Sequence, residues 1–223
     1  MVLLITTLLL AAVLSLPFEG GEVFTYEFRW LGINVGTMTL RTEDEGTCWR
    51  FTMESATRGA GAKMYPMEEV LVSVVRKSDF QTLFFQKHEN GKKGMKTEQT
   101  FFAPPEGLYY YHEFRAMTEP CVDTLSFMQY LRLPGSWRSP PPRAYDRGRL
   151  YTLSFEPPVM DSIYAGRQSL RAIKVVPHLK DEKDKEKKGG MILWYSDDTR
   201  RIPLAMDFSI PIGTLKARLD CAP

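Results

Sequence analysis

The sequence predicts an all-β protein, built from one curved antiparallel sheet of about ten strands that closes into a barrel or half-barrel and carries one short helix. Three observations support this fold class. Apolar residues recur with a period of two in many short segments. Turn-forming Gly, Asn and Asp residues separate those segments. A sheet with one continuous apolar face must be covered or must close on itself.

The composition is that of an ordinary globular protein of one domain. The 223 residues include 43% hydrophobic and 25% charged residues, and the formal net charge is +2. These values exclude wholesale disorder. A net charge so close to zero gives no electrostatic footprint for nucleic acid, so no nucleic-acid partner is expected.

The first three strands are predicted to form a meander. Apolar and polar residues alternate in residues 24–30, 37–41 and 49–54. The first turn lies in residues 31–36, where Gly32 and Asn34 tolerate a positive φ, and the second is the polar run 43–46. Further strands are predicted at residues 70–76, 82–87, 96–102, 150–155, 170–176, 191–195, 204–210 and 214–219.

Four other stretches are not predicted as strands. Residues 122–132 have apolar side chains at helical spacing and are predicted to form the short helix. Residues 59–63 resemble a phosphate-binding loop but lack its spacing, so a flexible strand connection is expected. The Pro-rich residues 133–149 are expected to cross between two halves of one sheet. Residues 180–188 are nine consecutive charged residues of mixed sign, a pattern typical of a solvated hairpin tip.

The N-terminal residues resemble a secretory signal. Residues 2–16 are apolar except for Thr6, Thr7 and Ser15, and Val13 and Ser15 suit the −3 and −1 positions of a cleavage site. We therefore expect a signal peptide at 1–16 and a single exported domain at 17–223, periplasmic or associated with the outer envelope. The alternative is a buried N-terminal helix. A membrane span needs about 20 apolar residues, and no segment of the mature chain reaches that length.

Three cysteines remain, and the sequence does not choose a pairing among them. An exported location permits one disulfide among Cys48, Cys121 and Cys221, with one thiol left over. Three reduced thiols are the alternative. Because the chain has no CxxC motif and no Cys/His cluster, no metal site and no cofactor are expected.

Three segments together resemble a known family. The first is Glu22-x-x-x-Tyr26-x-x-x-Trp30-x-Gly32-Ile33-x-x-Gly36, and the second is Asp123-Thr124-Leu125-Ser126 followed by Tyr130-Leu131-Arg132. The third is Trp194-Tyr195-Ser196-Asp197-Asp198-x-Arg200-Arg201-x-Pro203, followed by Ile212-Gly213-Thr214-Leu215-x-Ala217-x-Leu219. They resemble the bacterial exported domain-of-unknown-function family 3108 (DUF3108), over about residues 18–220. The resemblance implies an exported, antiparallel barrel-like domain, similar in fold to the YmcC-like envelope lipoproteins associated with capsule polysaccharide export. It implies no catalytic residues, and this chain lacks the cysteine that would carry a lipid.

The residue pattern points to binding rather than catalysis. The chain has neither a GxSxG elbow nor an HExxH motif. The alternation along each predicted strand assigns one row of apolar residues to the inner face of the sheet. These residues are Tyr26, Phe28, Trp30, Trp49, Phe51, Trp194, Met206 and Phe208. A barrel of about eight strands is either filled by such side chains or holds one small ligand. Polar residues Asp197, Asp198 and Arg200 follow Trp194 at a turn, where we expect the arginine to pair with the carboxylates.

These observations predict a non-catalytic cell-envelope protein that binds an amphiphilic ligand, lipid or glycan, or a protein partner through its curved sheet. The predicted binding residues are Tyr26, Phe28, Trp30, Trp194, Asp197, Asp198 and Arg200. The alternative is a structural or assembly factor in envelope polysaccharide or lipid export, acting within a protein complex. A hydrolase that uses Asp197, Asp198 and Glu98 is the least favoured function.

Overall fold

A computed structural model describes residues 17–92, 94–103, 107–110, 113–115, 120–137, 143–165, 168–183, 185–186, 190–210 and 213–220. The predicted signal peptide at 1–16 and Cys221 lie outside these residues. Within them, no helix combines the length and the apolar character needed to cross a membrane.

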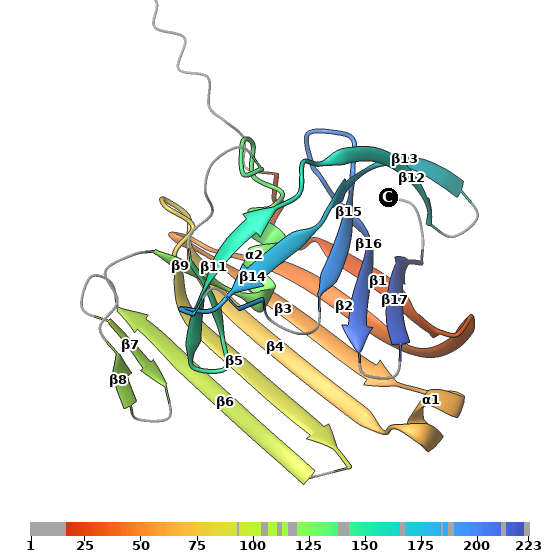
Figure 1. Cartoon of the computed structure of the whole chain (residues 1–223), viewed down its shortest axis with the longest axis horizontal. Coiled ribbons are helices and arrows are strands. Elements are labelled where there is room, and N and C mark those ends of the chain that lie inside the picture. Colours follow the sequence, from red (N-terminus) through yellow and green to blue (C-terminus); the bar gives the residue numbers. More distant parts are fainter. Residues whose placement is uncertain are drawn as a thin grey trace, which may run out of the picture.

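The larger of two sheets has thirteen strands, and its neighbouring strands are antiparallel throughout (Figure 1). In spatial order they are β12 (Val159–Ala165), β13 (Gln168–Val175), β15 (Met191–Ser196), β16 (Pro203–Ile210), β17 (Gly213–Leu219), β1 (Val23–Trp30), β2 (Ile33–Glu45), β3 (Cys48–Thr57), β4 (Met67–Arg76), β5 (Thr82–Gly91), β6 (Gly94–Ala103), β7 (Gly107–Tyr110) and β8 (Glu113–Arg115). The predicted curved antiparallel sheet is confirmed. In the described part of the chain β12 and β8 are its two edges, so hydrogen bonds do not close it into a barrel.

A second layer covers the inner face of this sheet. It consists of helix α2 (Thr124–Tyr130) and a four-stranded sheet, β14 (Pro177–Lys180), β11 (Arg149–Phe155), β10 (Arg143–Asp146) and β9 (Cys121–Asp123). Figure 1 shows these elements in front of the larger sheet. Residues 133–149 were expected only to cross between halves of one sheet, and this is wrong: they contain β10, which pairs with β9 and β11.

Contacts from this layer reach both halves of the larger sheet. Tyr145 of β10 packs edge-on against Phe102 of β6, with ring centroids 5.1 Å apart, and its hydroxyl lies 2.6 Å from that of Thr100. On the other side, the Tyr195 hydroxyl of β15 donates to the Met128 carbonyl of α2 at 2.8 Å. The second layer therefore fills the space that an open barrel would leave for a ligand.

Helix α2 begins where a buried carboxylate caps it. The Asp123 side chain accepts hydrogen bonds from the amides of Leu125 and Ser126 at 2.8 and 3.0 Å, and the Ser126 hydroxyl lies 2.8 Å from the Asp123 amide. This reciprocal capping box starts the helix after β9. The hydroxyls of Ser73 on β4 and Thr82 on β5 donate to the same carboxylate at 2.5 and 3.0 Å, which ties α2 to the larger sheet. Burial raises the pKa of Asp123.

A second helix lies where a flexible connection was expected. Residues Gly59–Met64 form α1, which packs on β2. The Arg58 amide donates to the Val35 carbonyl at 2.8 Å, and a β-carbon on Gly61 would lie 2.2 Å from that same oxygen. The glycine permits this close approach, because any side chain would collide with backbone.

The question of the disulfide pairing is partly answered. Cys48 and Cys121 are free thiols, and burial raises the pKa of Cys121 to about 12.

Candidate functional site

The predicted aromatic face is part of the core. Tyr26 and Phe28 are 0% and 5% exposed. The Tyr26 hydroxyl donates to the Pro203 carbonyl at 2.7 Å, and burial raises its pKa above the ordinary value. Trp30, at the end of β1, is partly buried against the same core. The second layer thus leaves Tyr26 and Phe28 almost no surface for a ligand.

Trp194 lies on the opposite face from Tyr26 and Phe28, so its predicted inward orientation is wrong. Residues that are paired across neighbouring strands point to the same face of the sheet. The pairs Trp194–Ala205, Ala205–Arg218 and Arg218–Glu27 therefore place Trp194 on the same face as Glu27. Glu27 lies between Tyr26 and Phe28 in β1, so this face is the outer one. Trp194 is nevertheless 7% exposed. Its Nε1 donates to the Asp161 carboxylate of β12 at 2.8 Å, so the edge strand shields this ring on the outer face.

The predicted polar residues Asp197, Asp198 and Arg200 do not pair with one another as ion pairs. Asp198 caps its own turn: Oδ1 accepts from the Ser196 hydroxyl at 2.8 Å and from two backbone amides, of Arg200 and Arg201, at 2.9 Å each. Asp197 pairs instead with Arg171 of β13 at 3.0 Å.

Arg200, 41% exposed, completes a charge cluster around the buried Glu22 and Arg132 that sequence reasoning missed. Its Nη2 lies 3.0 Å from Glu22, and that hydrogen bond raises the Arg200 pKa. Both oxygens of Glu22 also accept from Arg132 at 3.0 Å, and the side chains of Glu22 and Arg132 are 2% and 0% exposed. Gln129 and the ring of Phe18 contact the same guanidinium. The available signal in the sequence was Arg132, a charged residue directly after the apolar residues of α2. Its partner Glu22 lies 110 positions earlier in the chain, so no local pattern connects the two.

The third carboxylate of the hydrolase hypothesis has different neighbours. Glu98 lies on β6, where its carboxylate is 3.5 Å from the Tyr145 hydroxyl. Burial and the nearby Asp146 raise the pKa of Glu98. Asp197 and Asp198 instead belong to the turn after β15. The described residues contain no group of His, Cys, Asp and Glu suited to a metal ion.

A groove on the outer face combines cationic and apolar side chains. It has a volume of about 470 Å³ and lies between the edge strand β12 and the neighbouring strands β1 and β17. Its lining is Glu27, Arg29, Ile163, Tyr164, Lys216, Arg218, Leu219 and Asp220. Arg218 pairs with Asp207 at 2.6 Å and Arg29 pairs with Glu27 at 2.8 Å. Lys216 is exposed and has no ion pair among the described residues, so its ammonium group is available to an anion.

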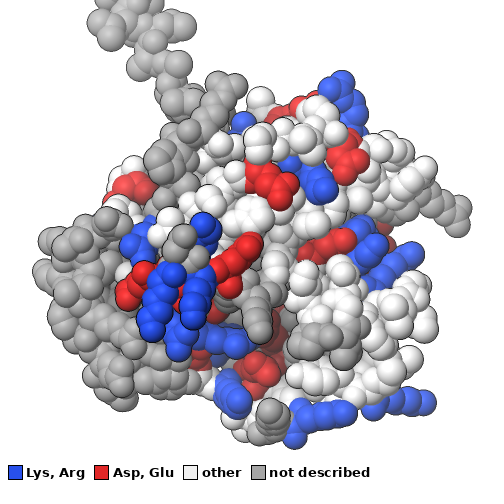
Figure 2. All heavy atoms as spheres, in the orientation of Figure 1, with Lys and Arg blue, Asp and Glu red and all other residues white. Residues whose placement is uncertain are grey.

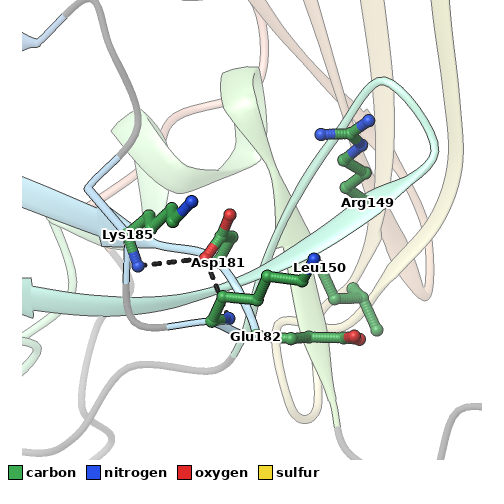
Figure 3. A pocket seen from close by; sticks show the side chains of 6 residues that line it. Arg149, Leu150, Asp181, Glu182 and Lys185 are labelled. Carbon is green, nitrogen blue, oxygen red and sulfur yellow. Dashed lines mark hydrogen bonds between the residues drawn. The ribbon is translucent and has the colours of Figure 1, made fainter.

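A second hollow, of about 420 Å³, lies beside the charged residues 180–188 (Figure 3). Its lining includes Arg149, Leu150 and Lys185, and Asp181 accepts from the amides of Lys183 and Lys185 at 2.9 and 3.0 Å. These hydrogen bonds lower the pKa of Asp181 and fold the loop onto itself. Among the described residues that line it only Leu150 is apolar, so this hollow offers less to an amphiphile than the groove beside β12.

Comparison with known proteins identifies the family and supports the fold. The family described as "Protein of unknown function (DUF3108)" matches residues 25–220. The chain belongs to the DUF3108 family. The crystal structure of a beta-barrel-like protein of the domain of unknown function DUF1849, from Brucella abortus, is similar with a TM-score of 0.58 and 10% sequence identity. That match covers 88% of this chain and 94% of the other. No curated protein matches the chain.

The segments that resemble DUF3108 supply the interior of this chain rather than the groove. Glu22, Arg132 and Arg200 meet in the charge cluster, in which the first two are buried. In β17, the family positions Ala217 and Leu219 are buried, whereas the intervening residues point to the outer face, where they line the groove. Apart from Leu219, the groove is lined by residues that do not belong to these motifs.

Proposed function

We propose that this DUF3108 protein is an exported, non-catalytic protein of the cell envelope that binds an amphiphilic lipid or glycan with an anionic group. The binding site is the groove between β12 and the outer faces of β1 and β17. One observation carries the proposal: Lys216, which has no ion pair among the described residues, shares a groove of about 470 Å³ with the exposed Tyr164 and the partly buried Ile163. Ligand pockets commonly have volumes of about 300–1,000 Å³.

The two ends of an amphiphile find different partners in this groove. Lys216 and the neighbouring Arg29 occupy directly opposed positions on β17 and β1, so both side chains point to the same face. A phosphate or carboxylate there accepts charge-assisted hydrogen bonds, which are stronger than neutral ones. Tyr164, 68% exposed, and Ile163 supply the apolar wall, on which an acyl chain or a sugar ring packs.

The remaining parts of the proposal rest on separate observations. The filled interior favours a site on the outside of the sheet. The engagement of Asp197 and Asp198 in an ion pair and a turn favours a non-catalytic role. The apolar residues 2–16 favour export.

The test is native mass spectrometry of the protein taken gently from the envelope fraction, before and after organic extraction. We expect an additional mass that extraction removes. It should also be lost in Lys216→Gln and in Tyr164→Ser. Lys96→Gln, at an exposed lysine of β6, is the matched control for net charge and should keep the mass. A bare wild-type mass, or a ligand that both groove variants retain, would overturn the proposal.

A second candidate function, an assembly factor within an envelope complex, is favoured by the edge strand β12. Among the described strands β12 pairs only with β13, and its residues Val159 and Met160 are 52% and 55% exposed. Such an edge can accept a strand from a partner protein. A membrane complex that co-purifies with the wild type and is lost in Met160→Lys would support this candidate. A partner-free, monodisperse protein in gentle extracts would count against it.

A further inference from the structure

Exposed apolar side chains from two elements lie at one end of the larger sheet. We call this cluster the apolar tip: Leu31, Ile33, Met64 and Tyr65, which are 76%, 56%, 48% and 54% exposed. The first two belong to the β1–β2 turn and the start of β2, and the other two end α1 and follow it. Figure 1 shows α1 and the β1–β2 turn projecting at the same end of the molecule.

The two elements are held against each other by backbone contacts. The Arg58 amide bonds to the Val35 carbonyl, and Gly61 lies so close to Val35 that it has no room for a side chain. The Thr57 hydroxyl donates to the Tyr65 carbonyl at 2.9 Å, which fixes the chain after the helix. The apolar tip is thus built on a rigid support.

Leucine is an unfavourable residue for the stability of the fold at position 31. The turn consists of Leu31 and Gly32, with Trp30 paired to Ile33, and the two turn residues have φ of 49° and 81°. Positive φ at both positions is typical of a type I′ turn, for which Asn and Gly are preferred. A bulky residue there is strained, and a side chain that is 76% exposed gains little from burial. An apolar side chain at this position is explained if Leu31 contacts another surface rather than the core of its own chain.

Cationic side chains lie on the elements that carry the apolar tip and on the neighbouring strand β17. Arg58 and Lys63 are exposed at the two ends of α1. Arg29 and Lys216 face each other on β1 and β17, next to the turn. Figure 2 shows Lys and Arg side chains along the margin where Figure 1 draws α1. Exposed apolar residues flanked by Arg58, Lys63 and Lys216 match an anionic lipid surface, where apolar side chains enter the interface and cations meet the headgroups.

We infer that the apolar tip docks this protein on an anionic lipid surface. This contact is separate from ligand binding in the groove, because Leu31 and Met64 do not line the groove. The two sites nevertheless share Arg29 and Lys216, so docking would hold the groove beside the headgroups.

Vesicle flotation of the full chain tests the inference, with Leu31→Asn as the central variant. The vesicles contain phosphatidylcholine alone, or three parts phosphatidylcholine to one part phosphatidylglycerol. Every variant retains residues 1–16, so that segment affects all of them equally. We expect Leu31→Asn to bind the anionic vesicles about tenfold more weakly, since it loses the favourable transfer of the leucine side chain out of water. Its melting temperature should stay the same or rise, because Asn suits the turn.

Two further variants sharpen the test. Met95→Gln removes an equally exposed apolar side chain (74%), from the start of β6, and should bind as the wild type does. The pair Arg58→Gln and Lys63→Gln should weaken binding to the anionic vesicles only. The inference is overturned if wild type binds no vesicles, if Leu31→Asn binds as wild type does, or if Met95→Gln loses as much affinity. Equal binding to both vesicle types would overturn the requirement for an anionic surface. Loss of vesicle binding together with a lower melting temperature in Leu31→Asn would overturn the argument from turn strain.

Discussion

Replacing Arg132 by lysine tests whether the buried guanidinium stabilises the fold through its five N–H donors rather than through its charge. Nη1 and Nη2 each donate to one oxygen of Glu22 at 3.0 Å, and Nη1 also donates to Gln129 at 3.1 Å. Nε donates to the Arg200 carbonyl at 3.2 Å, and Nη2 donates to the Pro17 carbonyl at 2.5 Å. All five donors are used. A lysine ammonium keeps the charge but offers only three donors.

Two of the five acceptors would therefore lose a charged donor in Arg132→Lys. At about 1.5 kcal/mol for each such hydrogen bond, the free energy of unfolding should fall by about 3 kcal/mol. With a slope of about 2 kcal/mol per molar urea, the unfolding midpoint should fall by about 1.5 M. Circular dichroism during urea unfolding measures this shift, and the slope should not change.

The matched control is Arg41→Lys. Arg41 and its partner Glu54 are 45% and 52% exposed and 3.7 Å apart. Exposed pairs of this kind contribute about 0–1 kcal/mol, so the midpoint should move by less than about 0.5 M. If Arg132→Lys unfolds at the same urea concentration as this control, the five-donor reasoning is refuted.

Three other perturbations have expected outcomes. Trp194→Ala should lower the free energy of unfolding by about 3–5 kcal/mol, because the ring is 7% exposed and bonded to β12; an unchanged melting temperature would contradict this. Gly61→Ala should cost about 1–3 kcal/mol, since the new β-carbon would lie 2.2 Å from a carbonyl oxygen of β2; calorimetry showing a more stable variant would exclude that clash. His178 lies 2.7 Å from Glu186, and this hydrogen bond raises the His178 pKa above 6.5. The hydrogen bond to protonated His178 therefore adds to the free energy of unfolding. This contribution is fully present below the pKa of histidine in the unfolded chain, about 6.5, and is lost as pH rises through the higher pKa of His178 in the folded protein. The melting-temperature advantage of wild type over His178→Gln should therefore be larger at about pH 6 than at about pH 8, and an advantage independent of pH would contradict the shift.

The strands could be predicted because each is a local pattern. The alternation in residues 24–30 is visible within seven positions, and the structure places β1 at Val23–Trp30. The helix predicted at 122–132 is confirmed as Thr124–Tyr130, and its start is local too, because Asp123 and Ser126 cap each other. Helix α1 was missed because Gly59 and Gly61 disfavour helices. The reason for glycine at position 61, a close approach to β2, is a tertiary contact.

The second layer and the groove could not be predicted from local patterns. Period two tells which residues share a face, but it does not say which face is inner. Trp194 shows the consequence, since both faces of β15 are buried, one by the core and the other by β12. The groove exists because Ile163 and Tyr164 of β12 lie near β1, more than 130 positions earlier in the chain. No periodicity reports such a contact.

The two proposed sites can be separated because each has a residue that the other lacks. Tyr164 lines only the groove, whereas Leu31 lies only in the apolar tip. Ligand loss in Tyr164→Ser with intact vesicle binding would mean that the protein docks on lipid without needing its ligand. Loss of the co-purified mass in Leu31→Asn, with the groove residues unchanged, would mean that the groove is filled only from a docked state. Arg29 and Lys216 border both sites, so substitutions there should weaken ligand retention and vesicle binding together.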